Sequence, residues 1–319
     1  MNSSSVLLIG AGQLGSRYLQ GLAAIEEPLS ITVVDPSGSS LALARDRLAQ
    51  AQPSQVHNVQ FATSLVDTPL QIDLALVVTP SHCRTAVVME IASRYQVKAW
   101  ILEKVLTQSC AQLDQIEQAL AGNSQAWVNT PRRLMEWHQA IRAQLMPAST
   151  APLQFRVGGG GWGLASNAIH FVDLVAWWTN AQVQSISADG LESWVDSKRF
   201  GFQEVFGHLL VHYSDGSELE LSCLPSADPV VISVDTPQGK WRIEEAAGLA
   251  IGSSGQQLLG QLSLQSALTA PLVAQILQKG RCALPTLAES VVQHRFLLQA
   301  MLEHWNRSQD RHDCSVPIT

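Results

Sequence analysis

Three glycines near the start of the chain have the types and spacing of a ligand-binding turn. Gly10, Gly12 and Gly15 form G-x-G-x-x-G directly after the apolar run Val6–Ile9. The first glycine permits a tight turn, the second lets the backbone approach a pyrophosphate, and the third lets a helix pack close to a strand. The pattern predicts a dinucleotide at this turn.

An acidic residue follows at the distance that such a site needs. Asp35 ends the next apolar run, ITVVD, where a carboxylate accepts hydrogen bonds from both ribose hydroxyls. That carboxylate would repel a 2′-phosphate, and the following residues PSGSS include no Arg or Lys. The sequence therefore favours NAD over NADP. We also expect Gln13 and Leu14 to bind the cofactor, because the N–H groups at the start of a helix attract phosphate.

Two later apolar runs end in residues that could act on a ligand. The first run, LALVVTP, ends in Thr79 and Pro80 and is followed by Ser81 and His82, and all four are expected to bind the cofactor. The second, WILEKVL, ends in Glu103, expected to bind the cofactor, and Lys104. A partly buried lysine exchanges protons readily, so Lys104 is a candidate catalytic and substrate-binding residue. An ordinary helix N-cap at Ser81 and a solvated Glu-Lys pair are the structural alternatives.

A glycine run opens the second cluster of candidate residues, in GGGGWGLASNAIHFVDL. Asn167 is expected to cap the helix that follows, with His170 three positions later and Asp173 one turn beyond. A histidine backed by a carboxylate is a reasonable acid/base unit, although a surface or capping histidine is the alternative. No third ligand accompanies the pair, so no metal site is expected.

Further residues are expected to bind substrate. Arg132 and Arg133, in NTPRR, can pair with an anionic group, although at least one of them is expected to form a structural salt bridge. Trp162 lies inside the glycine run. The predicted substrate-binding set is Lys104, Arg132, Arg133, Trp162, Asn167, His170 and Asp173, with Lys104 and His170 catalytic.

Composition excludes several classes of protein. The chain has 319 residues, of which 46% are hydrophobic and 15% charged, and a net charge of −7, so neither nucleic acid nor an anionic membrane is an expected partner. No apolar stretch is long enough for a membrane span, and MNSSS lacks the basic residues of a signal peptide. Five scattered cysteines without CxxC spacing indicate reduced thiols and a cytoplasmic protein.

The order of predicted elements gives the fold class. Strands and helices alternate over residues 1–130, which predicts an α/β fold with a doubly wound parallel Rossmann sheet. Residues 131–319 show period-2 stretches and turns, which predict an α+β domain with a mainly antiparallel open sheet. We expect its final helix to pack back on the first domain. We also expect the open face to form a homodimer or homotetramer through apolar side chains of Val205–Val211 and Leu219–Leu221.

The chain resembles the Gfo/Idh/MocA oxidoreductases over nearly its full length. The matching pieces, in order, are GAGQLG, VVDPS, VVTPS, LEKVL, NTPRR and IHFVDL. The resemblance implies hydride transfer between NAD(P) and a sugar, cyclitol or related polyol. It also implies that Lys104 matches the lysine of the family's Glu-Lys-Pro motif and that His170 matches the helix histidine that moves protons.

Three positions depart from the family pattern. Val105 replaces the proline after the lysine, and Arg84 stands where a histidine often follows the Thr-Pro motif. Ser166 stands where many dehydrogenases of the family carry a catalytic aspartate, and serine cannot serve as a carboxylate base. The leading hypothesis is an NAD-dependent sugar, nucleotide-sugar or polyol dehydrogenase. The alternatives are an NAD-dependent glycoside hydrolase of this fold and a non-enzymatic NAD-bound sensor or regulator.

Overall fold

The computed structural model of the chain describes residues 3–51, 57–66, 68–122, 125–145 and 151–319. Met1 and Asn2, the first residues of MNSSS, lie outside that set. The chain divides into two compact units. The first comprises Met1–Glu103, Asp114–Asn129 and Ser263–Leu287, and the second comprises Lys104–Leu113, Thr130–Leu262 and Ala288–Thr319.

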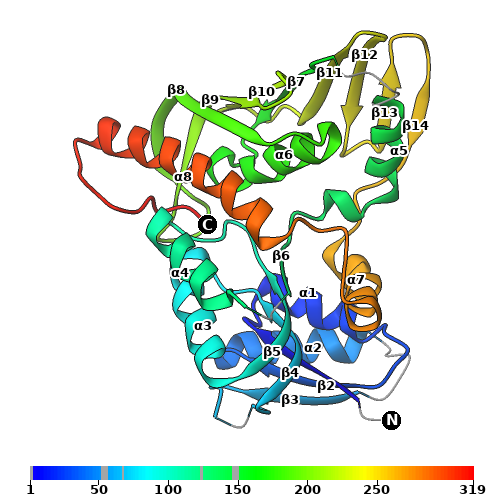
Figure 1. Cartoon of the computed structure of the whole chain (residues 1–319), viewed down its shortest axis with the longest axis vertical. Helices are drawn as coiled ribbons and strands as arrows, with labels where there is room; N and C mark the ends of the chain where they lie inside the picture. Colours follow the sequence, from blue (N-terminus) through cyan, green and yellow to red (C-terminus); the bar gives the residue numbers. More distant parts are fainter. Residues whose placement is uncertain (1–2, 52–56, 67, 123–124, 146–150) are drawn as a thin grey trace. The chain divides into compact units, whose positions relative to one another are not determined.

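A six-stranded parallel sheet forms the centre of the first unit (Figure 1). Its strands, in spatial order, are β3 (Asn58–Ala62), β2 (Leu29–Val34), β1 (Ser4–Ile9), β4 (Gln71–Val77), β5 (Gln96–Leu102) and β6 (Gln125–Val128). The central strand β1 ends in four consecutive buried residues, as a parallel strand covered on both faces requires. The strand order reverses between β1 and β4, which confirms the predicted dinucleotide-binding topology.

Helices cover this sheet as the alternating pattern predicted. They are α1 (Gln13–Leu22), α2 (Gly38–Gln50), α3 (Ser81–Arg94), most of α4 (Cys110–Leu120) and α7 (Gln265–Lys279). Helix α1 packs against α2 and α7. Helix α7 therefore belongs to the first unit, although it lies late in the chain.

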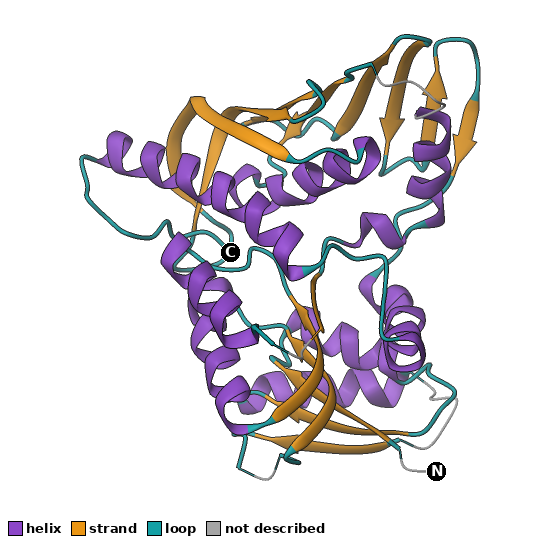
Figure 2. Cartoon of the chain, in the orientation of Figure 1, coloured by secondary structure: helices purple, strands orange, loops and turns teal. Residues whose placement is uncertain are grey.

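The second unit is built on an eight-stranded sheet (Figure 2). Its spatial order is β14 (Gln257–Leu259), β13 (Leu249–Gly252), β12 (Gly239–Glu244), β11 (Val231–Thr236), β7 (Gln154–Gly160), β10 (Glu218–Leu224), β9 (Gln203–Tyr213) and β8 (Val183–Asp196). Only β7 and β10 pair in parallel, so the sheet is mainly antiparallel, as expected.

One face of this sheet is covered by helices. The helical segments are the 3₁₀ turn η1 (Pro131–Leu134), α5 (Glu136–Leu145), α6 (Leu164–Thr179) and α8 (Leu287–Gln309), the last of which belongs to this unit from Ala288 onward. Helix α6 packs on β9 and β10, and α5 contacts β14. Helix α8 reaches β8, where His304 and Trp305 contact Trp194.

Most of the apolar residues expected on the open face of the sheet are buried instead, although Leu210 is exposed. Leu209, Val211 and Leu221 are buried on the side that packs against α6. Because side chains alternate along a strand, the residues between them lie on the opposite face. That face carries ion pairs, such as His212 with Glu218 at 3.1 Å.

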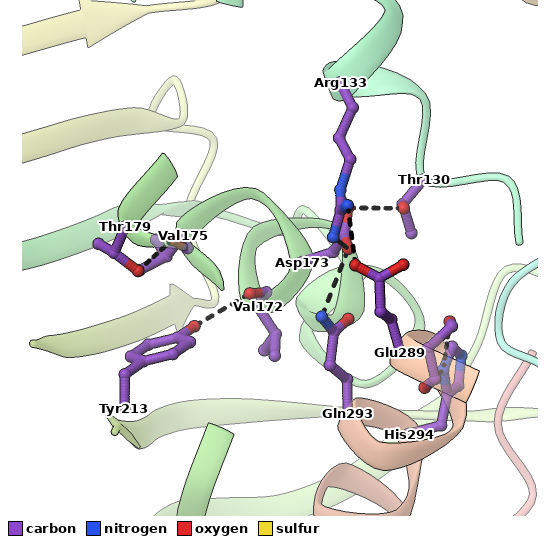
Figure 3. A network of polar contacts seen from close by, with 11 residues as sticks. Thr130, Arg133, Val172, Asp173, Val175, Thr179, Tyr213, Glu289, Gln293 and His294 are labelled. Atoms are coloured by element: carbon purple, nitrogen blue, oxygen red, sulfur yellow. Dashed lines mark hydrogen bonds and ion pairs between the residues drawn. The ribbon is translucent and has the colours of Figure 1, made fainter. Parts of the chain in front are cut away.

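A buried network ties η1 to α6 and α8 (Figure 3). Arg133 donates two hydrogen bonds to Asp173, from Nη2 to Oδ1 at 2.5 Å and from Nε to Oδ2 at 3.0 Å. Thr130 donates its hydroxyl proton to Asp173 Oδ2 at 2.7 Å, and Gln293 lies 3.4 Å from Oδ1. Burial raises the pKa of Asp173, although its three partners oppose that shift.

Two further observations concern membrane-spanning helices and cysteines. Among the described residues, no helix combines the length and apolar character needed to cross a membrane. The five cysteines are all free thiols.

The Asp173 network yields a test of what holds this unit together. We expect Arg133→Ala to lower the free energy of unfolding by about 3–5 kcal/mol, because it leaves a buried carboxylate without its cation. Urea unfolding of this variant would be compared with Arg156→Ala, which breaks exposed pairs on the sheet and should cost at most about 1 kcal/mol. Equal losses in both variants would contradict a special role for the buried pair.

Candidate active site

The glycine turn has the shape that a bound pyrophosphate needs. Gly10 has φ +91°, and a Cβ there would lie 2.7 Å from Val78 O. A Cβ on Gly15 would lie 1.7 Å from Gly10 O, so the helix and the strand approach too closely for any side chain. Around Gly12, by contrast, a Cβ would meet nothing within 4 Å. Gly12 also caps α1 without a side-chain hydrogen bond, which leaves the start of the helix open to an anion.

Asp35 lies beside this turn, at the end of β2. Its Oδ2 accepts the N–H of Ala11 at 2.7 Å and its Oδ1 accepts the N–H of Ser37 at 2.8 Å. A carboxylate has about four acceptor sites, so two remain for ribose hydroxyls. These backbone bonds also fix the orientation of the carboxylate before any ligand binds.

The segment after β4 meets the glycine turn, since a Cβ on Gly10 would also lie 3.2 Å from Thr79 N. Thr79 Oγ1 is buried and has no hydrogen-bond partner among the described residues, as expected of a group that awaits a ligand. Pro80 caps α3, Ser81 is buried as its first residue, and His82 is exposed. The Arg84 guanidinium donates a hydrogen bond to Thr79 O, so this departure from the family pattern anchors the strand end.

Glu103 is buried at the end of β5 and is already hydrogen-bonded. Tyr18 donates its hydroxyl proton to Glu103 Oε1 at 2.6 Å, and Asn129 Nδ2 donates to the same oxygen at 2.7 Å. Burial raises the pKa of Tyr18 well above its ordinary value, and the Glu103 charge adds to that shift. The contacts therefore make Glu103 a link between α1, β5 and β6.

Sequence reasoning missed Arg47, which lies against the start of α1. Its guanidinium donates to Gln13 O and to Gln13 Oε1, each at 2.6 Å. The Gln13 side chain is therefore engaged by α2. No spacing rule links these two residues, which are 34 positions apart.

Lys104, the first residue of the second unit, is held on the first turn of α6. Its ammonium donates to Asn167 Oδ1 at 2.9 Å and to Ser166 O at 3.1 Å. Asn167 is oriented in turn, because its Nδ2 donates to Trp162 O at 2.7 Å. The peptide bond between Lys104 and Val105 is cis.

The expectation that Asn167 caps this helix was wrong. Helix α6 begins at Leu164, and Gly163 is its N-cap with φ +77°. The cap position needs no side-chain oxygen of its own, because Glu204 on β9 reaches the helix start and accepts the N–H of Ala165 at 2.9 Å. Asn167 is thereby free to turn its amide oxygen toward Lys104.

His170 lies one turn further along α6. Burial lowers its pKa well below the ordinary value, and the positive charges of Lys104 and Arg132 lower it further. The imidazole is therefore neutral near pH 7. Its Nδ1 is buried without a hydrogen-bond partner in the described part of the chain. No hydrogen bond among those residues joins it to Asp173.

Both arginines of NTPRR are engaged by carboxylates within the second unit. Arg132 binds both oxygens of Glu245, at 2.6 and 2.7 Å, and its guanidinium lies 4.3 Å from the centre of the Phe171 ring. His138 Nε2 lies 2.9 Å from the same carboxylate. Although burial opposes it, the positive charge of Arg132 lowers the pKa of Glu245 far below its ordinary value. Arg133 is paired with Asp173, as described above.

Trp162 packs inside the second unit. Its indole N–H donates to Ser222 O at 2.9 Å, and its ring meets Phe171 edge-on with centroids 5.4 Å apart. Its backbone carbonyl orients Asn167, so Trp162 supports the lysine site. No group of three His, Cys, Asp or Glu side chains that could hold a metal ion occurs within the described ranges.

Sequence comparison finds a family match for the N-terminal part of the chain. Residues 4–130 match the model of the oxidoreductase family Gfo/Idh/MocA, NAD-binding Rossmann fold. These residues therefore form an NAD-binding domain of that oxidoreductase family. The open space at Gly12, the uncapped start of α1 and the unpartnered Thr79 hydroxyl fit that cofactor. No curated protein matches the chain in sequence.

Solved structures share the fold of the whole chain. An oxidoreductase from Agrobacterium radiobacter, in complex with NAD+, L-tartaric acid and magnesium, has a TM-score of 0.70 at 15% identity, covering 96% of this chain and 97% of the other. Scyllo-inositol dehydrogenase from Lactobacillus casei, with NAD(H) and scyllo-inositol, has a TM-score of 0.69 at 15% identity, with 95% and 96% covered. UDP-N-acetylglucosamine 3-dehydrogenase from Acidithiobacillus ferrooxidans has a TM-score of 0.68 at 15% identity, covering 95% of this chain and 97% of the other.

The glycine turn provides a matched pair of variants. We expect Gly12→Ala to keep the free energy of unfolding within about 0.5 kcal/mol of the parent, because its Cβ meets no protein atom. It should nevertheless weaken NADH binding at least about tenfold, because the Cβ enters the space assigned to the pyrophosphate. Gly15→Ala should instead destabilise the fold. Fluorescence titration with NADH and urea unfolding measure the two effects, and unchanged NADH affinity in Gly12→Ala would contradict the assignment.

Proposed function

We propose that the protein is an NAD-dependent dehydrogenase that transfers a hydride between the nicotinamide and a CH–OH carbon of a sugar, nucleotide sugar or polyol. The observation that carries the proposal is the setting of Lys104. Lys104 directly follows Glu103, the acid at the end of β5. Its amine is bound to the first turn of α6, near the neutral imidazole of His170. Inositol and nucleotide-sugar dehydrogenases of the same overall fold support the substrate class.

In the oxidation direction, bound NAD+ supplies the acceptor for the hydride that leaves the carbon. Lys104 Nζ, in its neutral form, takes the proton of the hydroxyl as the carbonyl forms. The two oxygens that bind this amine fix its position on α6. His170 is kept neutral by burial and by the neighbouring cations, so the proton stays on Lys104, the stronger base, and the imidazole stays an uncharged partner near it.

The other residues expected to bind substrate have different contacts, and we assign them different roles. Asn167 positions Lys104 directly, and Arg132 acts on His170 through its charge. We assign Arg133 and Asp173 to the support of the fold, because each satisfies the other inside the unit.

Cofactor preference and location follow from the same observations. We propose NAD rather than NADP as the working cofactor, because Asp35 places a fixed carboxylate where a 2′-phosphate would add a second negative charge. We also propose a cytoplasmic location, which five free thiols favour.

Replacement of the lysine tests the mechanism. We expect Lys104→Met to lower kcat by about 10²–10⁴-fold, the usual contribution of a positioned acid or base, with NADH affinity nearly unchanged. Lys98→Met is the matched control, since Lys98 lies exposed on β5 and pairs with Asp73. Turnover would be followed by NADH absorbance on the best substrate from a panel of inositols, sugars and nucleotide sugars. If Lys104→Met retains turnover within about threefold, the lysine is structural and a non-enzymatic role gains support.

We propose further that the open face of the eight-stranded sheet forms a homodimer or homotetramer. Its ion pairs, including His208–Glu220 and Arg156–Asp235, give the face a strongly charged character around the exposed Leu210. Light scattering should therefore give two or four times the chain mass of 34.6 kDa, with a smaller mass at high salt because exposed charges are screened. A mass of one chain at micromolar concentration would contradict the proposal.

A further inference from the structure

A carboxylate from a distant strand lies at the start of α6. Glu204, the second residue of β9, accepts the Ala165 N–H with Oε2 and the Ser166 hydroxyl with Oε1. The N–H groups of a first helical turn lack partners within the helix and favour a negative charge. Glu204 therefore belongs to this turn in space, although 38 positions separate it from Ser166.

The same turn binds Lys104. The Lys104 ammonium donates a hydrogen bond to the backbone oxygen of Ser166, and the Ser166 hydroxyl donates one to Glu204. The other hydrogen-bond acceptor described above for the ammonium, Asn167 Oδ1, is also uncharged. Glu204 and Lys104 attract one another electrostatically across this turn.

Burial raises the pKa of Glu204, while its hydrogen bonds to the first turn of α6 and the positive charge of Lys104 oppose that shift. His170, one turn further along α6, is itself acted on by the charges of Lys104, Arg132 on η1, Glu245 after β12 and His294 on α8. Arg132 already neutralises Glu245, so Glu204 is the acid without a direct cationic partner in the contacts described above.

We propose that Glu204 is a positioning residue for the dehydrogenase reaction, whose negative charge at the first turn of α6 sets the pH at which Lys104 exchanges its proton. The proposal rests on the dehydrogenase function proposed above. Ser166 has no acidic group of its own, and its hydroxyl connects the carboxylate of β9 to the lysine site. The charge stabilises the ammonium form of Lys104 and so raises the pH at which the amine becomes a base.

The titration of Lys104 can be measured without any substrate. Reductive methylation with ¹³C-formaldehyde labels the lysines, which number five and are assigned by single Lys→Arg replacements at Lys98, Lys104, Lys198, Lys240 and Lys279. We expect Glu204→Gln to lower the pH midpoint of Lys104 by about 0.5–1 unit and to leave the other four unchanged. Glu192→Gln, which removes an exposed carboxylate from the neighbouring strand β8, is the control and should shift none of them.

A second pair of variants tests whether a relocated charge restores the titration of Lys104. Ser166→Asp combined with Glu204→Gln moves the carboxylate to the other end of the same hydrogen bond. Its Lys104 midpoint should return to within about 0.3 unit of the parent. Ser166→Asn combined with Glu204→Gln has the same shape without the charge, and its midpoint should stay about 0.5–1 unit low.

The outcomes separate this proposal from the proposed function. A Lys104 midpoint that is the same in the parent and in both charge-free variants overturns the role of Glu204, whatever the protein oxidises. If the parent oxidises no member of the substrate panel, the dehydrogenase function fails, while the Lys104 titration still decides whether Glu204 controls the amine. Where a substrate is found, the rising limb of kcat/KM against pH should move to lower pH in Glu204→Gln by the same amount.

Discussion

Hydrogen bonds to Ser166 O and Asn167 Oδ1 hold the Lys104 ammonium on the first turn of α6, and other polar contacts of the second unit hold that turn in place. Trp162 O fixes the Asn167 amide, and Glu204 binds the start of the helix. Further along, the Arg133–Asp173 pair anchors the same helix to η1. The turn that binds the lysine is therefore held by residues from several strands and helices, which would keep the geometry of the proposed proton-transfer group fixed.

The charges in this unit explain why the His170 imidazole is uncharged. Lys104 and Arg132 are both positive, and together with burial they keep His170 uncharged. Each acid in the interior offsets a particular cation or helix end, since an uncompensated buried charge costs several kcal/mol. Glu245 neutralises Arg132, and Asp173 neutralises Arg133. The Lys104 amine, which is bound to the first turn of α6, and the neutral imidazole of His170 on that helix are the two groups assigned to the proposed reaction.

Much of the first unit could be predicted from the sequence, because its signals are local. The glycine spacing, the apolar run before it and the acid at Asp35 lie within one β-α-β segment, and its topology was confirmed. The second unit was harder to predict. Alternation in Val205–Val211 showed two faces but not which of them packs on α6. Glu204 and Glu245 act on residues 38 and 113 positions away, and no sequence spacing encodes such pairs.

The central claim is that the chain moves a hydride between a polyol carbon and the nicotinamide. Its most direct test uses inositols and nucleotide sugars deuterated at their ring carbons, incubated with the protein and NAD+. Mass spectrometry of the reduced nicotinamide should show one deuterium per molecule formed, because the hydride passes directly from carbon to cofactor. A nicotinamide that stays oxidised and free of deuterium with every member of the panel would contradict the claim.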